Sequence, residues 1–249
     1  MFGVVPKVLW EKTNPADDKN RIEMALRLCL IRGRGRVVLV DSGIGEKWDE
    51  KQRQIYAIRS KALNIDPLSV TDVVLSHLHF DHVGGATGIA EGKPYLTFPN
   101  AKCYIQKANL SHAHAPTEKD RASFLENTIE PLVNSGSLVV LDGEKEISPG
   151  ITIVVTQGHT PGHQLVKVSD EKTTLLCCGD TVPTASHIPI PWVMAYDLQP
   201  LVTMDEKRGL LERAATEKWI LFYVHDPFVA ATTVEESEGK FRRGVEVKI

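Results

Sequence analysis

The sequence predicts an α+β protein in which β-sheets pack together and helices lie outside them. Short β-rich runs recur along the 249 residues, and Gly, Asp, Asn or Pro bounds each of them. Longer segments between some of these runs carry a helical pattern. Runs of consecutive strands that are separated by occasional helices favour sheets packed together with helices on the outside.

Each predicted strand ends where turn-forming residues interrupt an apolar run. In chain order the predicted strands are 26–31, 36–40, 72–75, 102–105, 137–141, 151–155, 165–168, 174–178 and 220–224. The predicted helices are 49–61, 118–132 and 205–217. The last helix places Leu210, Leu211 and Ala214 on one face, with Thr203 or Asp205 as its cap.

Composition predicts one domain spanning residues 1–249, because a 42% hydrophobic content is enough for a sizeable core and no linker or repeat divides the chain. A formal net charge of -3 gives no general attraction to nucleic acid. No segment approaches the length of an apolar membrane span, and the N-terminus lacks a secretory pattern. We therefore expect a cytoplasmic protein whose partner is a small-molecule substrate, with no nucleic acid and no membrane. Whether it forms a homodimer stays open.

The strongest chemical signal is the run of three imidazoles and a carboxylate in residues 77–82, directly after a predicted strand. Such a density of ligand side chains indicates a metal site rather than a core pattern. Gly84-Gly85 lets the chain turn closely into a helix, so we expect the ligands on a strand-to-helix loop. Alternate residues of an extended loop face the same way. His77, His79 and Asp81 would then converge while His82 reaches a neighbouring point, which suits two metal ions better than one.

Three further segments each place a good metal ligand at the end of a predicted strand, namely His159, Asp180 and His225. Glycine or proline breaks the strand at each place, so the side chain can leave the sheet edge and point into a shared cleft. The whole set holds five histidines and two aspartates, enough for two ions that share one carboxylate. This mixture of donors suits zinc, and iron, manganese and cobalt stay open.

Together with Val40-Asp41-Ser42-Gly43, these motifs resemble the metallo-β-lactamase fold family over the whole chain. The resemblance implies a four-layer αβ/βα sandwich of two mixed β-sheets flanked by helices. It also implies that His77, His79 and His159 hold one ion, that Asp81, His82 and His225 hold the other, and that Asp180 bridges the two. Asp41 would support the site without binding metal.

Other polar residues are predicted to stand behind or outside the ligand set. A ligand histidine usually needs a partner for its second ring nitrogen, so His163 and Asp226 are expected to support the ligands. A structural core role for His163 is an equal alternative. His112 and His114 also read HxH, but no carboxylate follows them, and we expect a surface loop there.

Two metal ions about 3.5 to 4 Å apart lower the pKa of a bridging water and hold the substrate oxygen that becomes negative. A metal-bridging hydroxide would then attack the substrate, while Asp81 orients it and passes a proton to the leaving alkoxide. The phrases His-Leu-His-Phe-Asp-His and Gly-His-Thr-Pro-Gly-His resemble the family branch of N-acyl homoserine lactone lactonases and of phosphotriesterases such as methyl parathion hydrolase. This resemblance implies a hydrolase of carboxylic esters or lactones with promiscuous phosphotriesterase activity. Many such lactonases carry a tyrosine three residues after the bridging Asp, where this chain has Pro183.

Specificity is assigned to the proline-rich segment 183–200, which is predicted as a long shaped loop. His187, Trp192, Met194 and Tyr196 would form an apolar wall with polar tips, although Trp192 and Met194 are equally compatible with packing the loop down. The alternatives to an ester or lactone hydrolase are a thioesterase of the hydroxyacylglutathione hydrolase type, an iron-bearing redox or sulfur-transfer enzyme on the same fold, and a non-catalytic binding protein.

Overall fold

The structure is a computed structural model that describes residues 1–45 and 65–249. The chain forms two compact units, each assembled from segments that are distant in the sequence. Unit 1 consists of Met1–Arg27, Gln106–His112 and Leu141–Ile249, and unit 2 of Leu28–Ile105 and Ala113–Val140. The predicted helix 49–61 lies outside the described residues. A single domain over 1–249 stays a prediction.

Unit 2 contains a five-stranded mixed sheet with the order β1-β2-β3-β6-β7. Its strands are β1 (Cys29–Gly33), β2 (Arg36–Val40), β3 (Asp72–Val74), β6 (Lys102–Gln106) and β7 (Leu138–Leu141). β1 pairs with β2 antiparallel, whereas β2–β3 and β3–β6 are parallel. The continuous apolar runs of β2 and β3 are buried, as expected for parallel strands that are covered on both faces. A separate hairpin joins β4 (Thr87–Ala90) and β5 (Lys93–Leu96).

The helices near this sheet are shorter than the sequence predicts. The expected helix 118–132 divides into the 3-10 turn Arg121–Ser123 and α5 (Glu126–Val133), because Phe124 and Leu125 between them are extended. α5 buries Ile129 and Leu132. The remaining elements of unit 2 are α3 (Phe80–Val83) and the 3-10 turns Pro67–Ser69 and Gly84–Ala86. The helix α4 (Lys107–His114) follows β6 in the chain, and most of its residues belong to unit 1.

The expected surface loop at His112 and His114 is wrong, because both residues lie in α4. Side chains two positions apart on a helix point to different sides, so an HxH pair there does not present two converging ligands. His114 is exposed and forms an ion pair with Glu130, 3.1 Å between Nε2 and Oε1.

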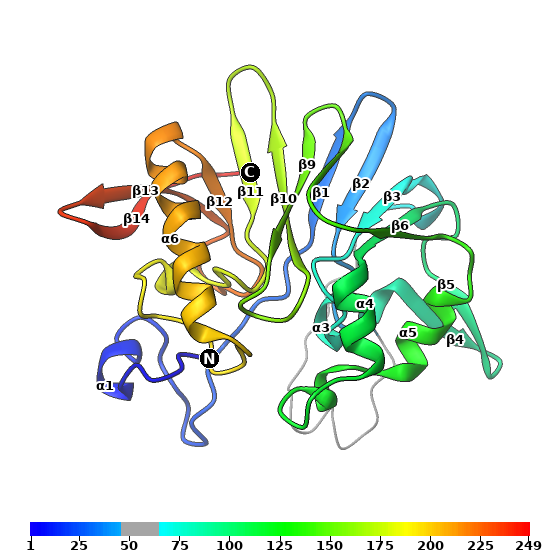
Figure 1. Ribbon diagram of the computed structural model, residues 1–249, viewed down its shortest axis with the longest axis horizontal. Coiled ribbons are helices and arrows are strands. Elements are labelled where there is room, and N and C mark those ends of the chain that lie inside the picture. The colour runs from blue at the N-terminus through cyan, green and yellow to red at the C-terminus, as the bar shows by residue number, and fades with distance from the viewer. Residues whose placement is uncertain (46–64) are drawn as a thin grey trace. The chain divides into compact units, whose positions relative to one another are not determined.

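Unit 1 contains a seven-stranded mixed sheet with the order β14-β13-β12-β11-β10-β9-β8. Its strands are β8 (Lys145–Ser148), β9 (Ile151–Thr156), β10 (His163–Ser169), β11 (Thr174–Cys177), β12 (Ile220–Phe222), β13 (Ala231–Ser237) and β14 (Lys240–Glu246). Only β11 and β12 pair in parallel among these strands. A parallel pair needs a long crossover, and here the crossover contains the proline-rich segment 183–200 followed by α6 (Pro200–Glu217). α6 packs on β13 (Figure 1).

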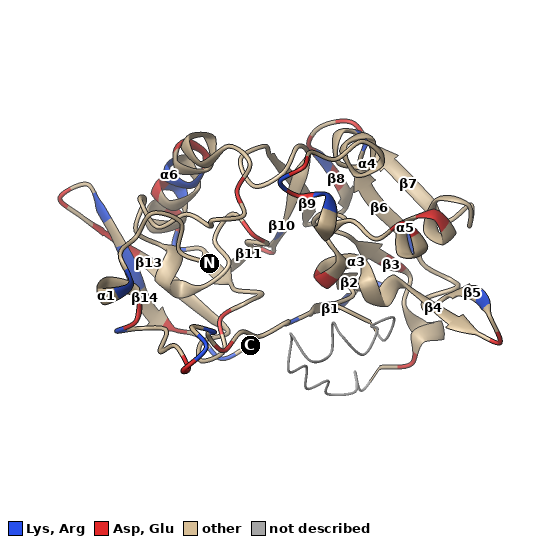
Figure 2. Cartoon of the chain, turned by 90° about the horizontal axis from the view of Figure 1, so that it is seen from below, with Lys and Arg blue, Asp and Glu red and all other residues tan. Residues whose placement is uncertain are grey.

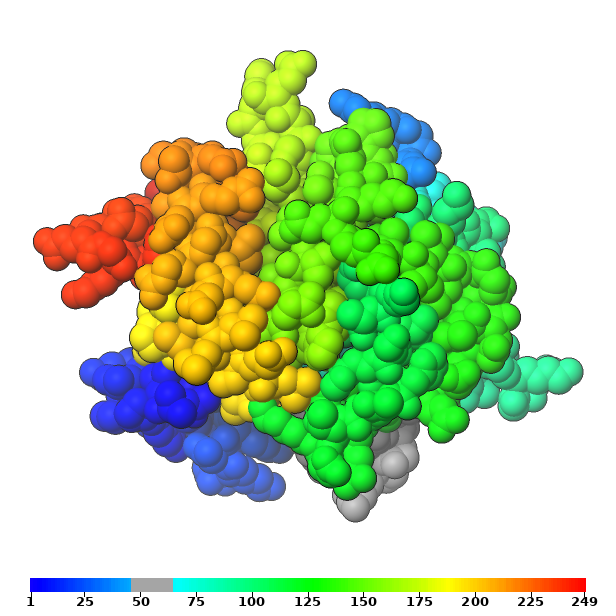
Figure 3. Space-filling view, in the orientation of Figure 1, coloured from blue at the N-terminus to red at the C-terminus, as the bar shows by residue number. Residues whose placement is uncertain are grey.

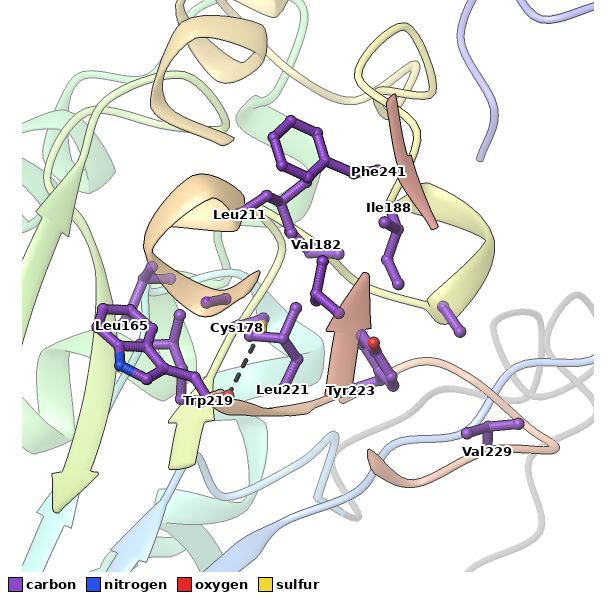
Figure 4. Packing of buried hydrophobic residues seen from close by; sticks show 14 of the residues in the cluster. Leu165, Cys178, Val182, Ile188, Leu211, Trp219, Leu221, Tyr223, Val229 and Phe241 are labelled. Atoms are coloured by element: carbon purple, nitrogen blue, oxygen red, sulfur yellow. Dashed lines mark hydrogen bonds between the residues drawn. The ribbon is translucent and has the colours of Figure 1, made fainter. Parts of the chain in front are cut away.

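α6 begins earlier than the sequence predicts. Its first residue is Pro200 and its N-cap is Gln199, so neither Thr203 nor Asp205 is the cap. Proline suits this position because its missing N–H would have no partner inside the helix. Of the residues predicted to share one helix face, Leu211 and Ala214 are buried and Leu210 is partly buried, in a cluster with residues of the sheet such as Leu221 and Phe241 (Figure 4).

The strands that the sequence analysis missed are β4, β5, β8, β13 and β14. β4, β5 and β8 have four residues each, while β14 and the last three residues of β13 are largely exposed, so their hydrophobic pattern is weak. In the β13–β14 hairpin Ala231, Val234 and Phe241 are buried, and residues of both charge signs occupy exposed positions along the two strands (Figure 2). Within the described part of the chain, no helix is long and apolar enough to cross a membrane.

Candidate metal centre

The ligand motif of unit 2 spans the end of β3 and the short helix α3. His77 lies in the loop after β3, His79 is the N-cap of α3, and Asp81 and His82 lie inside that helix. The helix therefore precedes the glycine pair instead of following it. A Cβ on Gly84 would lie 2.2 Å from the carbonyl oxygen of Ile44, so glycine is needed for the close approach of two backbone segments.

Asp41 is the centre of the hydrogen bonds behind this motif. It is buried and has φ of 60°, a conformation that is uncommon for residues other than glycine. Its Oδ1 accepts the backbone N–H of Ser76 at 2.6 Å, and its Oδ2 accepts the Ser76 hydroxyl and Nδ1–H of His82, both at 2.9 Å. Because Nδ1 of His82 is the donor, Nε2 carries the lone pair that a metal requires.

Ser76 extends the same arrangement to the first histidine of the motif. Its hydroxyl proton goes to Asp41, so its oxygen accepts Nδ1–H of His77 at 3.0 Å. The ring of His77 packs against those of His79 and His82, with centroids 4.3 and 4.1 Å apart. These three histidines are buried, whereas 22% of the Asp81 side chain is exposed. Asp81 is thus the carboxylate of this motif that a solvent molecule or a ligand can reach.

The ligand residues of unit 1 meet at one carboxylate. Asp180 follows β11, and its Oδ1 lies 3.0 Å from Nε2 of His225 while its Oδ2 lies 3.3 Å from Nε2 of His159. Nδ1–H of His159 donates to Asp197 at 2.9 Å, and Nδ1–H of His225 donates to the carbonyl oxygen of Ala25 at 3.0 Å. Both Nε2 atoms therefore carry lone pairs that face the oxygens of Asp180. Acceptors that face one another repel, and a cation bound between them stabilises the arrangement.

His163 has both ring nitrogens engaged in holding its surroundings. Its Nε2 accepts the backbone N–H of Asp180 at 3.1 Å, and its Nδ1 lies 2.9 Å from the hydroxyl oxygen of Thr156. Its proton is therefore on Nδ1, as in His159 and His225, but its Nε2 lone pair accepts a backbone N–H. The contact places His163 behind Asp180, where it orients the backbone rather than a ligand ring.

Asp226 differs from the expectation that it supports a ligand histidine. Its Oδ1 accepts the backbone N–H groups of Phe228 and Val229, and its Oδ2 accepts that of Ala185. These contacts organise the turn after His225. The second nitrogen of His225 is held instead by a backbone carbonyl, which no side-chain pattern in the sequence signals.

The four predicted substrate-contacting residues differ in their access to solvent. Tyr196 is 57% exposed, Trp192 is half-buried, and Met194 and His187 are buried. His187 stacks on Phe2 with centroids 4.8 Å apart, and its Nδ1 lies 2.8 Å from the Thr184 hydroxyl. The N-terminal residues thus lie against the segment 183–200 (Figure 3). With no exposed surface, His187 supports this loop from inside and forms no part of an accessible wall.

The sequence analysis missed two residues that orient ligands, Ser76 and Asp197. Ser76 directly precedes the motif, and its small hydroxyl side chain resembles that of an ordinary turn residue. Asp197 lies 38 positions from His159 in the chain, within the proline-rich segment. No side-chain pattern in the sequence indicates this role, and only the folded chain brings Asp197 to the ring of His159.

The donor set fits a resident metal centre. His77, His82, His159 and His225 each have Nδ1 beside an oxygen acceptor, which leaves Nε2 for a metal. Neutral imidazoles and carboxylates are the ligands that zinc and related divalent ions take in catalytic sites.

Comparisons with known proteins agree with a metal-binding set of histidines and aspartates. The model of the metallo-beta-lactamase superfamily matches residues 29–240. A curated N-acyl homoserine lactonase from a Bacillus species is 27% identical over 190 residues, which cover 75% of this chain and 67% of the relative. For another, from Bacillus cereus, the chain spans only 60% of the relative's length.

Solved structures show the same fold. A probable metal-dependent hydrolase from Staphylococcus aureus has a TM-score of 0.89 at 25% identity, covering 100% of this chain and 92% of that one. The dizinc quorum-quenching lactonase AidC, in complex with an N-acyl homoserine product, has a TM-score of 0.74 at 21% identity and covers 91% of this chain and 81% of its own. The predicted α+β class with mixed sheets is confirmed. This chain therefore belongs to the metallo-β-lactamase superfamily, as a hydrolase related to the N-acyl homoserine lactonases.

Proposed function

We propose that the protein holds two divalent metal ions, zinc being the best match, and that it hydrolyses lactones or related carboxylic esters. The proposed ligands are His77, His79, Asp81, His82, His159, Asp180 and His225. The observation that carries the proposal is the shared tautomer of four of these histidines, whose Nδ1–H groups are each held by an oxygen. The lactonase relatives support the choice of substrate class.

When bound, two such ions supply an activated water and positive charge for the substrate oxygen. The residues of the chain contribute position and proton transfer. Asp81 is the partly exposed carboxylate of its motif, so it can orient the nucleophile and deliver a proton to the leaving alkoxide. Asp180, which is held at its backbone by His163, keeps His159 and His225 on either side of one carboxylate.

Pro183 affects which substrates we expect, because it stands where many related lactonases have a tyrosine. Its carbonyl oxygen accepts the backbone N–H of His225 at 2.9 Å, so this position anchors a ligand through the main chain. Proline has neither an N–H nor a polar side chain. A substrate oxygen that becomes negative therefore receives no hydrogen bond from residue 183, in contrast to lactonases with tyrosine there. This difference favours a second candidate within the same chemistry, an esterase or phosphotriesterase acting on substrates with better leaving groups.

The test is a hydrolysis panel on protein loaded with zinc or with manganese. The panel contains N-acyl homoserine lactones of several acyl lengths, aryl esters, S-acyl glutathione and a paraoxon-like triester. We expect turnover of a lactone or an ester, and an Asp81→Asn variant that keeps its metal should lose about 100-fold or more of kcat. Asp170→Asn, in an exposed turn, is the matched control.

Three outcomes would contradict the proposal. Less than one metal ion per folded chain would remove the metal centre. Turnover of S-acyl glutathione alone would select a thioesterase. Iron content with persulfide or oxygen turnover, and no hydrolysis, would select the redox or sulfur-transfer enzyme.

A further inference from the structure

Two adjacent charged residues of α6, Glu206 and Lys207, hold different segments of unit 1. Charged side chains on an outer helix normally extend into water. Lys207 instead has 0% exposure, and Glu206 is only partly exposed. Both reach toward backbone groups of loops rather than toward side chains of opposite charge.

Lys207 satisfies three carbonyl groups of the proline-rich segment 183–200. Its Nζ donates to the carbonyl oxygens of His187 at 2.9 Å, Pro189 at 3.0 Å and Trp192 at 2.8 Å. An ammonium group has three N–H donors, so all are used. Burial lowers the pKa of Lys207 to about 7, and the charge of Asp197 acts in the opposite direction.

The same segment contains no strand, and Pro189 and Pro191 have no backbone N–H. Its internal backbone hydrogen bonds close short turns, such as Trp192 N–H to the carbonyl oxygen of Pro189 at 2.9 Å and Val193 N–H to that of Pro191 at 3.1 Å. Lys207 joins these turns, because its three donors tie together residues 187–192, directly before Met194 and Tyr196.

Glu206 holds the chain that leads into His159. Its two carboxylate oxygens accept the backbone N–H groups of Gln157 at 2.7 Å and Gly158 at 3.1 Å. The backbone N–H of Leu198 donates to the carbonyl oxygen of His159 at 3.0 Å. A Cβ on Gly158 would lie 2.4 Å from the backbone nitrogen of Thr203, so the loop is in close contact with the first turn of α6.

We propose that Lys207 is a positioning residue that sets the shape of the substrate loop 183–200, while its neighbour Glu206 is a positioning residue for the ligand His159. The proposal rests on the proposed function and deepens it, because it assigns substrate selection and metal retention to separate residues of one helical turn. Neither residue touches the reacting atoms.

The test compares Lys207→Met and Lys207→Gln with Arg208→Gln, an exposed neighbour on the same helix. Methionine keeps most of the length of the side chain without donors, and glutamine, which is also shorter than lysine, keeps two N–H donors. We expect KM for lactone or ester substrates to rise about tenfold or more in Lys207→Met, because small displacements of a binding loop are costly. The rise should be smaller in Lys207→Gln. Metal content and kcat should change less than twofold in both.

Glu206→Gln should weaken metal binding and leave KM nearly unchanged, the reverse of the Lys207 variants. One amide oxygen cannot accept both backbone N–H groups in the same way, so His159 loses part of its support. We expect the metal dissociation constant to rise about 10-fold to 100-fold, as for other residues behind ligands. KM at saturating metal should stay within twofold of the wild type. Glu212→Gln, which is exposed on the same helix, is the control.

Hydrogen exchange separates this proposal from the proposed function. If the wild type hydrolyses no substrate, the proposed function fails, yet amides within residues 187–193, the part that Lys207 holds, should still exchange faster in Lys207→Met than in Arg208→Gln. Unchanged exchange and unchanged KM in Lys207→Met would overturn the role of Lys207. If both Lys207 variants fail to fold while Arg208→Gln folds, Lys207 acts in folding and the proposal is also rejected.

Discussion

Single residues behind the ligands determine which ring nitrogen faces the metal. Asp41 accepts three hydrogen bonds, from the backbone and hydroxyl of Ser76 and from His82. Asp197 accepts the Nδ1–H of His159 in the same way. Each carboxylate fixes the tautomer of an imidazole, which a ligand list alone does not specify.

Replacing Asp41 with asparagine tests this arrangement. The backbone should be preserved, because asparagine tolerates a positive φ. Its amide group offers one oxygen where the carboxylate offers two, so one donor among Ser76 and His82 loses its acceptor. We expect metal affinity to fall about 10-fold to 100-fold, measured by competition with a chelator. Asp66→Asn, an exposed cap of a 3-10 turn, should change nothing, and an equal affinity in both variants would contradict the role.

His187 gives a prediction about pH. Burial, followed by the charge of Lys207, lowers the pKa of His187 to about 3 in the folded protein. Below pH 6.5, the ordinary pKa of a histidine being about 6.5, this residue binds a proton in the unfolded chain but not in the folded one. The contribution of neutral His187 to the free energy of unfolding is therefore fully present above about pH 6.5 and is lost as the pH falls. At pH 5 the loss should be about 2 kcal/mol.

The measurement is denaturant unfolding of metal-free protein at pH 7.5 and pH 5. His187→Phe should show a loss between the two pH values that is smaller than that of the wild type by this amount. His114→Gln, at an exposed site, should behave as the wild type does. Equal pH dependence in all three proteins would contradict the assignment.

At the scale of elements, the loops and short helices carry the chemistry while the strands carry the core. The sequence analysis located strands 36–40 and 102–105 closely because their apolar runs are continuous and buried. It missed the β13–β14 hairpin because the second part of β13 and most of β14 are exposed and charged, which leaves no continuous apolar run. It also placed the start of α6 too late, since packing of the Gln199–Thr203 turn on the His159 loop is a tertiary contact.

Two glycine-to-alanine changes should have opposite effects. In Gly84→Ala the new Cβ would collide with the backbone of Ile44 beside α3, and we expect a loss of about 1–3 kcal/mol in stability. At Gly209, inside α6, a Cβ meets nothing within 4 Å, and alanine should stabilise the protein by about 0.5–1 kcal/mol. Thermal unfolding of both variants checks the pair. A stable Gly84→Ala protein would show that the close backbone approach is not required.

At the scale of the whole molecule, the proposed ligands come from segments that are far apart in the sequence. Metal ions that bind only the folded chain stabilise it, by about 4 kcal/mol when the free concentration is 1,000 times the dissociation constant. Removing the metals with a chelator should therefore lower the melting temperature, and restoring zinc should recover it. Calorimetry measures both steps. A melting temperature that does not change with chelator or zinc would contradict a resident metal centre.

The sequence by itself determined the chemistry of the ligands and their places at strand ends. Those features are local, because a strand end and the side chains next to it are set by a few consecutive residues. Only the tertiary structure decided that Asp197 orients His159, that Asp226 holds backbone groups, and that Lys207 is buried against three carbonyls of the proline-rich segment. These contacts join residues far apart in the chain. The atoms that Asp226 and Lys207 contact belong to the backbone, which every residue has, so no pattern of side chains in the sequence indicates them.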